Sequence, residues 1–108
     1  MSNAIVGTWR AVAREATLGV TPRRPLKPGQ IADLVIREGG TGYAIKKKLF
    51  GENRETLIWE QVDSAGYIIE LPEAGLVLAA ICMGSELITK WNSSLKSIDG
   101  MGIFYQRA

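Results

Sequence analysis

The sequence has 108 residues, of which 46% are hydrophobic and 22% charged, and its net charge at pH 7 is +2. This length suits one domain that can fold without disulfides or metals. So mild a charge predicts neither a nucleic-acid partner nor a membrane partner. Histidine is absent and Cys82 is the only cysteine. We therefore expect no intrachain disulfide, no metal site, no cofactor and no enzyme activity, because the commonest general base and metal ligand is missing.

The sequence predicts no leader at its N-terminus. Residues 1–4 are expected to be a tag remnant or a disordered N-terminus, and residues 5–108 to form a single domain. No charged head followed by a long apolar stretch opens the chain, and the longest apolar run, GLVLAAICMG, is too short to span a membrane as a helix. A cytoplasmic location is the default expectation, with export as the alternative if a leader has been removed.

Alternation of apolar and polar residues, with a period of two, dominates the chain and predicts strands. The first strand places Trp9, Ala11 and Ala13 on one face and Arg14 on the other. The loop 16–30 follows, with three prolines and two glycines that rule out regular structure. In it Arg23 and Arg24 offer contacts to an anionic ligand, and a mobile connector is the alternative. We expect strands at residues 5–14, 31–37, 43–50, 55–63, 67–71, 76–83, 86–92 and 101–107.

A lysine run marks the third predicted strand. Tyr43 and Ile45 are expected to point inward, Lys46 and Lys48 outward, and Lys47 inward or near the rim. Together with the loop sequence PRRPLK, the lysines form either a solvated face, which we favour, or a nucleic-acid site whose binding would weaken steeply with salt.

The sixth predicted strand is apolar on both faces. Such a strand is normally buried on both sides, and no helix is predicted to cover its outer face. A second subunit is the natural cover. We therefore predict a homodimer through the outward residues Val77, Ala79, Ile81 and Met83, with Ile58 and Val62 extending the contact.

Short connections join antiparallel neighbours, and closing eight strands into a barrel removes exposed edges. The sequence therefore predicts an all-β fold, a small up-and-down antiparallel barrel of about eight strands, with a sandwich as the alternative. Every tryptophan lies on the apolar face of its strand, as a barrel interior requires. Cys82 is expected to be a buried hydrophobic residue, and the glutamates at the loop edges to be solvated.

The stretch GTWRAV resembles the Gly-x-Trp signature of the lipocalin superfamily. The turn EGGTGY, the strand LIWEQV, the hairpin DSAGYIIEL and the closing YQRA make the chain similar to short bacterial lipocalin-like domains. The resemblance implies that Trp9 plugs the narrow end of the barrel, with Arg107 over its indole, and that a loop after the first strand crosses the open mouth. Gly7 lets the backbone pass close beneath the barrel.

Two functions remain as alternatives. The resemblance favours a barrel that binds a small hydrophobic molecule, with Gln61, Tyr67, Thr89 and Tyr105 as polar anchors. The tryptophans favour a filled barrel that acts as a dimeric structural or protein-interaction module without a ligand. For the first function, the predicted apolar wall consists of Leu34, Ile36, Tyr43, Ile45, Leu57, Trp59, Ile69, Leu78 and Trp91.

Overall fold

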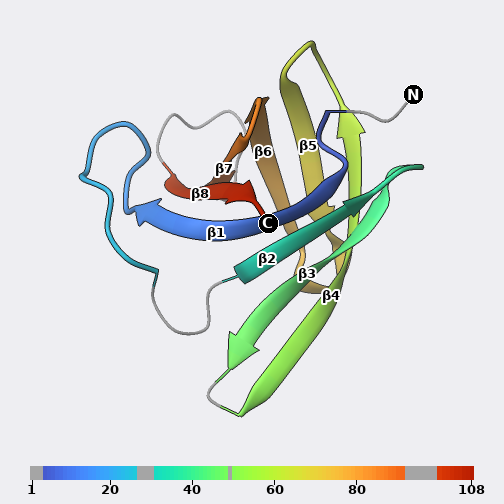
Figure 1. Cartoon of the computed structure of the whole chain (residues 1–108), viewed down its shortest axis with the longest axis horizontal. Coiled ribbons are helices and arrows are strands. Elements are labelled where there is room, and N and C mark those ends of the chain that lie inside the picture. Colours follow the sequence, from blue (N-terminus) through green and yellow to red (C-terminus); the bar gives the residue numbers. More distant parts are fainter. Residues whose placement is uncertain (1–3, 27–30, 49, 92–99) are drawn as a thin grey trace.

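Each strand pairs antiparallel with the strand before it, and the last strand returns to pair with the first, so the sheet closes into a barrel (Figure 1). This computed structural model describes residues 4–26, 31–48, 50–91 and 100–108. A short 3₁₀ turn, Pro72–Ala74, follows β5. The strands are β1 Gly7–Glu15, β2 Ile31–Arg37, β3 Thr41–Lys48, β4 Gly51–Gln61, β5 Gly66–Leu71, β6 Leu76–Met83, β7 Glu86–Trp91 and β8 Met101–Arg107.

The all-β barrel predicted from the sequence is confirmed, and β2, β6 and β8 have the predicted bounds. The largest error concerns the hairpin between β3 and β4. Lys48 pairs with Gly51, so β4 begins at Gly51 and the predicted turn GEN lies inside the strand. Gly51 has a φ of +99°, which a glycine adopts readily, and it therefore marks the hairpin end. Residue 92, the last of the predicted seventh strand, lies outside the described residues.

A β-bulge in β1 changes which residues face inward. Ala11 pairs with Tyr105 of β8, but the register then shifts, and Ala13 pairs with Phe104. A bulge inserts one extra residue, so the alternation of faces is reversed beyond it. The prediction that Ala13 shares a face with Trp9 is therefore wrong. Ala13 faces outward with Phe104.

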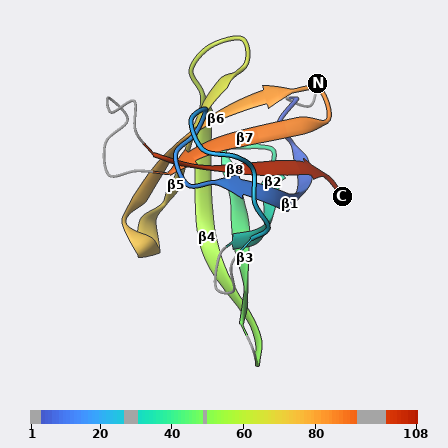
Figure 2. The same ribbon diagram turned by 90° about the vertical axis from the view of Figure 1, so that its left-hand side faces the viewer.

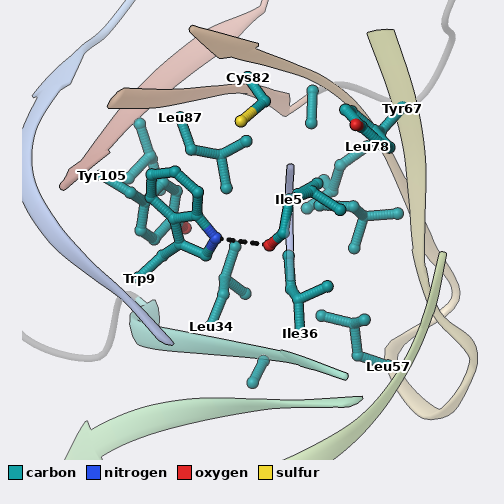
Figure 3. Packing of buried hydrophobic residues seen from close by; sticks show 14 of the residues in the cluster. Ile5, Trp9, Leu34, Ile36, Leu57, Tyr67, Leu78, Cys82, Leu87 and Tyr105 are labelled. Carbon is teal, nitrogen blue, oxygen red and sulfur yellow. Dashed lines mark hydrogen bonds between the residues drawn. The ribbon is translucent and has the colours of Figure 1, made fainter. Parts of the chain in front are cut away.

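The start of the chain packs against Trp9 in the barrel (Figure 3). Trp9 is fully buried and its indole Nε1 donates a hydrogen bond of 2.8 Å to the Ile5 carbonyl oxygen. The Arg107 guanidinium lies over the indole, with its Cζ 4.3 Å from the ring centroid, and also donates to the carbonyl oxygens of Ala4 and Val6. The expected cation–π contact at the base of the barrel is therefore present.

The β3–β4 hairpin extends beyond the barrel (Figure 2). In the described chain β4 pairs with β5 only from Ile58 to Gln61, so its part 51–57 has β3 as its one neighbour. The Trp59 N–H donates to the Gly40 carbonyl oxygen, on the β3 side of the strand. Because the N–H groups of successive residues point to opposite sides, the Thr56 N–H, three residues earlier, points to the open side. There the Glu73 carboxylate accepts it at 2.8 Å, which lowers the pKa of Glu73.

The described part of the long loop, residues 16–26, is held against β8. The Arg23 guanidinium lies 3.9 Å from the ring centroid of Phe104 and within ion-pair distance of Glu15 and Glu86. Phe104 faces outward, yet this cover leaves it only 4% exposed. Leu26 packs against the interior cluster, and residues 27–30 lie outside the described residues. The described part of the loop is thus anchored on β1, through the Arg14–Arg24 bridge, and on the outer face of β8.

Candidate interaction surface

Side chains from all eight strands pack together in the interior of the barrel (Figure 3). Trp9, Tyr67 and Tyr105 are its largest fully buried side chains. Trp59 and Trp91 are partly buried and pack against the cluster. The predicted wall residues that are fully buried are Leu34, Ile36, Leu57, Ile69 and Leu78.

Two of the predicted polar anchors meet inside the barrel. Thr89 is fully buried; its hydroxyl donates to the Ile103 carbonyl oxygen at 3.3 Å and accepts from the Trp91 indole at 2.6 Å. Tyr105 is also fully buried, and its hydroxyl lies near that of Thr89 without hydrogen-bonding geometry. Burial raises the pKa of Tyr105 far above its usual range, and the nearby Thr89 hydroxyl opposes this only in part. The Tyr105 hydroxyl is thus buried near the Thr89 hydroxyl but without a hydrogen-bond partner.

The other two predicted anchors separate. Tyr67 is buried and its ring makes an edge-on contact with Trp59, with 6.0 Å between the centroids. Burial raises the pKa of Tyr67. Gln61 is exposed and its amide donates to the Asp63 carbonyl oxygen in the next turn. The prediction that Gln61 is an interior anchor is therefore wrong, because its side chain serves the turn after β4.

Tyr43 and Ile45 were both predicted to line the interior, and both lie on the outer face of β3. The inward position between them belongs to Ala44, which is fully buried. Tyr43 instead lies between the guanidinium groups of Arg37 and Arg54, at 5.0 Å and 4.7 Å from its ring centroid. The contact is an outer-surface cation–π pair, so Tyr43 cannot line a ligand cavity in the barrel.

The predicted basic cluster of β3 lysines and loop arginines is also not formed, because the inward and outward residues of β3 are exchanged. Lys46 shares the inner side of β3 with Ala44, and its Nζ lies 3.0 Å from Glu55 Oε1, so its predicted outward position is wrong. Lys47 is exposed rather than inward, and the Lys48 side chain lies outside the described part. Arg23 sits on β8, so the loop arginine and the strand lysines do not gather into one patch.

Nothing in the geometry of Cys82 suggests a nucleophile. It is buried on β6, and burial raises the pKa of its thiol, which favours the unreactive neutral form. Among the residues that the structure describes, no group of histidine, cysteine, aspartate and glutamate side chains is arranged to hold a metal ion. The same residues include no helix long and apolar enough to cross a membrane.

The outer surface of β4, β5 and β6 carries the main concentration of exposed apolar side chains. Of the eight large hydrophobic side chains that are exposed in the described chain, five lie here, with exposed fractions from 36% for Val77 to 56% for Val62. All four residues that the sequence assigns to the outside of β6 do face outward. We define the apolar face by Ile58, Val62, Ile68, Val77, Ala79, Ile81 and Met83.

A hollow of about 200 Å³ opens on this face between β4 and β5. It is lined by Ile58, Trp59, Glu60, Ile68 and Glu70. Neither Glu60 nor Glu70 forms an ion pair with another described residue. The hollow thus combines apolar walls with two carboxylates that lack a counter-charge.

A cation lies on the opposite flank of the face. The strand registers align Glu60 of β4, Ile68 of β5, Ala79 of β6 and Lys90 of β7 in one row across the sheet. Directly paired residues share a face, so all four side chains point outward. The Lys90 ammonium, like the two carboxylates, has no ion-pair partner in the described chain.

Comparison with known proteins adds no assignment. No protein-family model, no curated protein and no solved structure matches this chain. The case for a function therefore rests on the geometry of the barrel and its surface.

Proposed function

We propose that the protein is a non-enzymatic, filled barrel that acts as a dimeric protein-interaction module through its apolar face. The observation that carries the proposal is the gathering of five exposed large hydrophobic side chains on β4 and β6 and just beyond β4. Contiguous apolar surface of this kind on a soluble protein is typical of an interface. The lipocalin-like resemblance stays part of the proposal for the barrel itself.

The interior supports this choice over ligand binding. Three aromatic rings occupy the space that a hydrophobic ligand would take, and the hollow lies outside the barrel wall. The hollow itself, at about 200 Å³ and open to solvent, is smaller than the roughly 300 Å³ or more of usual ligand pockets, so it does not offer a second ligand site. The absence of histidine and the buried state of Cys82 support the non-enzymatic part.

Sedimentation velocity tests the proposal. The wild-type protein is expected to sediment as a dimer at micromolar concentration. Ile81→Lys places an ammonium in the middle of the apolar face and is expected to give a monomer. Val12→Lys is the matched control, since Val12 is 43% exposed on the bulge of β1, away from the face. A monomeric wild type, or a dimeric Ile81→Lys variant, would contradict the proposal.

One observation favours a second function, the binding of a small, largely apolar molecule in the interior. The Tyr105 hydroxyl is buried without a hydrogen-bond partner, and such a group is costly unless something bonds to it. Native mass spectrometry of protein purified from its own host would detect a retained molecule. The Tyr105→Phe variant keeps the ring and should lose that molecule; retention by the variant would contradict an anchoring role.

A further inference from the structure

We propose that the occupant of the apolar face is a second copy of this chain, and that the partner's Lys90 enters the hollow between Glu60 and Glu70. The inference rests on the proposed function and adds the register of the two subunits. The order of charged and apolar residues across the sheet matches a twofold axis parallel to the strands.

The row that crosses the apolar face is self-complementary. It runs Glu60, Ile68, Ala79, Lys90, with opposite charges at its ends and apolar residues between. Two sheets that pack face to face around a twofold axis parallel to the strands reverse the order of the strands in the facing copy. With the axis between β5 and β6, β4 faces the partner's β7, and β5 faces the partner's β6. Glu60 then lies opposite the partner's Lys90, and Ile68 opposite the partner's Ala79.

Other positions of the axis leave charges without partners. With the axis over β5, Glu60 faces the partner's Ala79; with the axis over β6, Lys90 faces the partner's Ile68. Either arrangement desolvates a charge against an apolar side chain, which is strongly unfavourable. With the axis between β5 and β6, Glu60 lies opposite the partner's Lys90. Glu70, in the next row, lies opposite the partner's Val77 and takes its counter-charge from the same lysine.

The hollow has the chemistry that a lysine side chain requires. Ile58 and Ile68 provide apolar walls for the methylene stem, and Glu60 and Glu70 provide acceptors for the ammonium. The two carboxylates belong to neighbouring strands and adjacent rows and both line the hollow, so an ammonium in the hollow lies between them. The twofold axis repeats the contact, so each dimer contains two such lysine sites.

Charge reversal tests the register. Lys90→Glu puts three carboxylates at each contact, and Glu60→Lys/Glu70→Lys puts three ammonium groups there. Each variant alone is expected to raise the dimer dissociation constant about 100-fold. When the two variants are mixed in equal amounts, both contacts regain opposite charges, and native mass spectrometry should show a 1:1 heterodimer. Circular dichroism checks that each variant is folded, which these surface positions allow.

The outcomes separate the inference from the proposed function. A dimeric wild type with a monomeric Ile81→Lys variant supports the apolar face as interface, whatever the charge reversals do. If the Lys90→Glu variant then dimerises like the wild type, or the mixed variants fail to associate, the lysine site is wrong while the face stands. A monomeric wild type overturns both. As a control, Arg10→Glu, on the outer face of β1, should leave the dissociation constant unchanged.

Discussion

Gly7 is held by two constraints at once. Its φ of +141° is one that side chains rarely adopt, and a Cβ there would lie 2.8 Å from Arg107 Nη1. We expect Gly7→Ala to lower the free energy of unfolding by about 3 kcal/mol, the upper end for a strained backbone position. Urea denaturation followed by tryptophan fluorescence measures the change.

A second glycine gives the matched control. Gly75 has a φ of +66°, and a Cβ added there would meet no other atom within 4 Å, so Gly75→Ala should cost only about 1 kcal/mol. The double variant Gly7→Ala/Arg107→Ala should lose less free energy of unfolding than the two single variants lose together, because the new methyl group no longer meets the guanidinium. Equal losses in the two single glycine variants would contradict the close approach at Gly7.

The unpaired hydroxyl of Tyr105 predicts an unusual stabilising substitution. Tyr105→Phe removes a buried group without a partner and should raise the free energy of unfolding by about 1 kcal/mol. Thr89→Val is the control: it leaves the Trp91 indole N–H without its acceptor and should be destabilising. Thermal denaturation of the three proteins at neutral pH gives the comparison, and a destabilised Tyr105→Phe would show that the hydroxyl is bonded.

The same residue predicts a dependence on alkaline pH. Burial raises the pKa of Tyr105 in the folded state, whereas a tyrosine in the unfolded chain titrates near about 10. Above that pH the unfolded chain gives up the proton first, so the free energy of unfolding is unaffected by this group below about pH 10 and falls as the pH rises further. The fall in stability between about pH 9 and 11 should be smaller in Tyr105→Phe than in the wild type.

At the scale of the elements, the side chain of Arg23 holds the loop after β1 in place. Arg23 covers Phe104 and reaches Glu15 and Glu86. Because exposed ion pairs and cation–π contacts are each weak, Arg23→Ala should cost no more than about 1 kcal/mol of global stability. It should nevertheless speed hydrogen exchange of the Arg24 amide, which bonds to the Arg14 carbonyl. Arg10→Ala should leave that amide protected; unchanged exchange in Arg23→Ala would show that the backbone alone holds the loop.

Strands differed in how far their sequence determined their placement. The bounds of β6 could be predicted because glycine-containing turns flank it, and alternation divided its residues correctly between two faces. In β3, hydrophobicity favoured Tyr43 and Ile45 inside, but the pairing to β2 put the smaller Ala44 there. The inward Lys46 is acceptable because Glu55 neutralises it, and a partner on another strand cannot be recognised from local alternation. The bulge in β1 could not be predicted either, because it is defined by the register of β1 against β8 and not by the sequence of β1 alone.

The hollow could not be predicted at all, whereas its apolar surroundings could. The outward residues of β6 follow from alternation along one strand. The position of Glu60 and Glu70 relative to Lys90 depends instead on the register of four strands. Register across a barrel is set jointly by turns, bulges and closure. Period-two patterns along a single strand contain no information about it.

For the whole molecule, dimerisation through the apolar face predicts thermal stability that depends on concentration. A dimer that unfolds to monomers is stabilised by mass action. The midpoint of thermal unfolding should therefore rise by about 3 °C for each tenfold increase in protein concentration. The Ile81→Lys variant should show a constant midpoint across the same range. A constant midpoint in the wild type would contradict a dimer that forms with folding.

The open stretch of β4 has a consequence for the behaviour of the protein in acid. The hydrogen bond from Thr56 keeps Glu73 ionised into mildly acidic solution, since it lowers the pKa of that carboxyl group. Strong acid protonates Glu73 and weakens its hold on the strand. The Thr56 N–H then joins the edge of β4 that has no strand beside it, and an unpaired edge is a site for pairing with another chain. Acidification should therefore favour association through this edge of the hairpin.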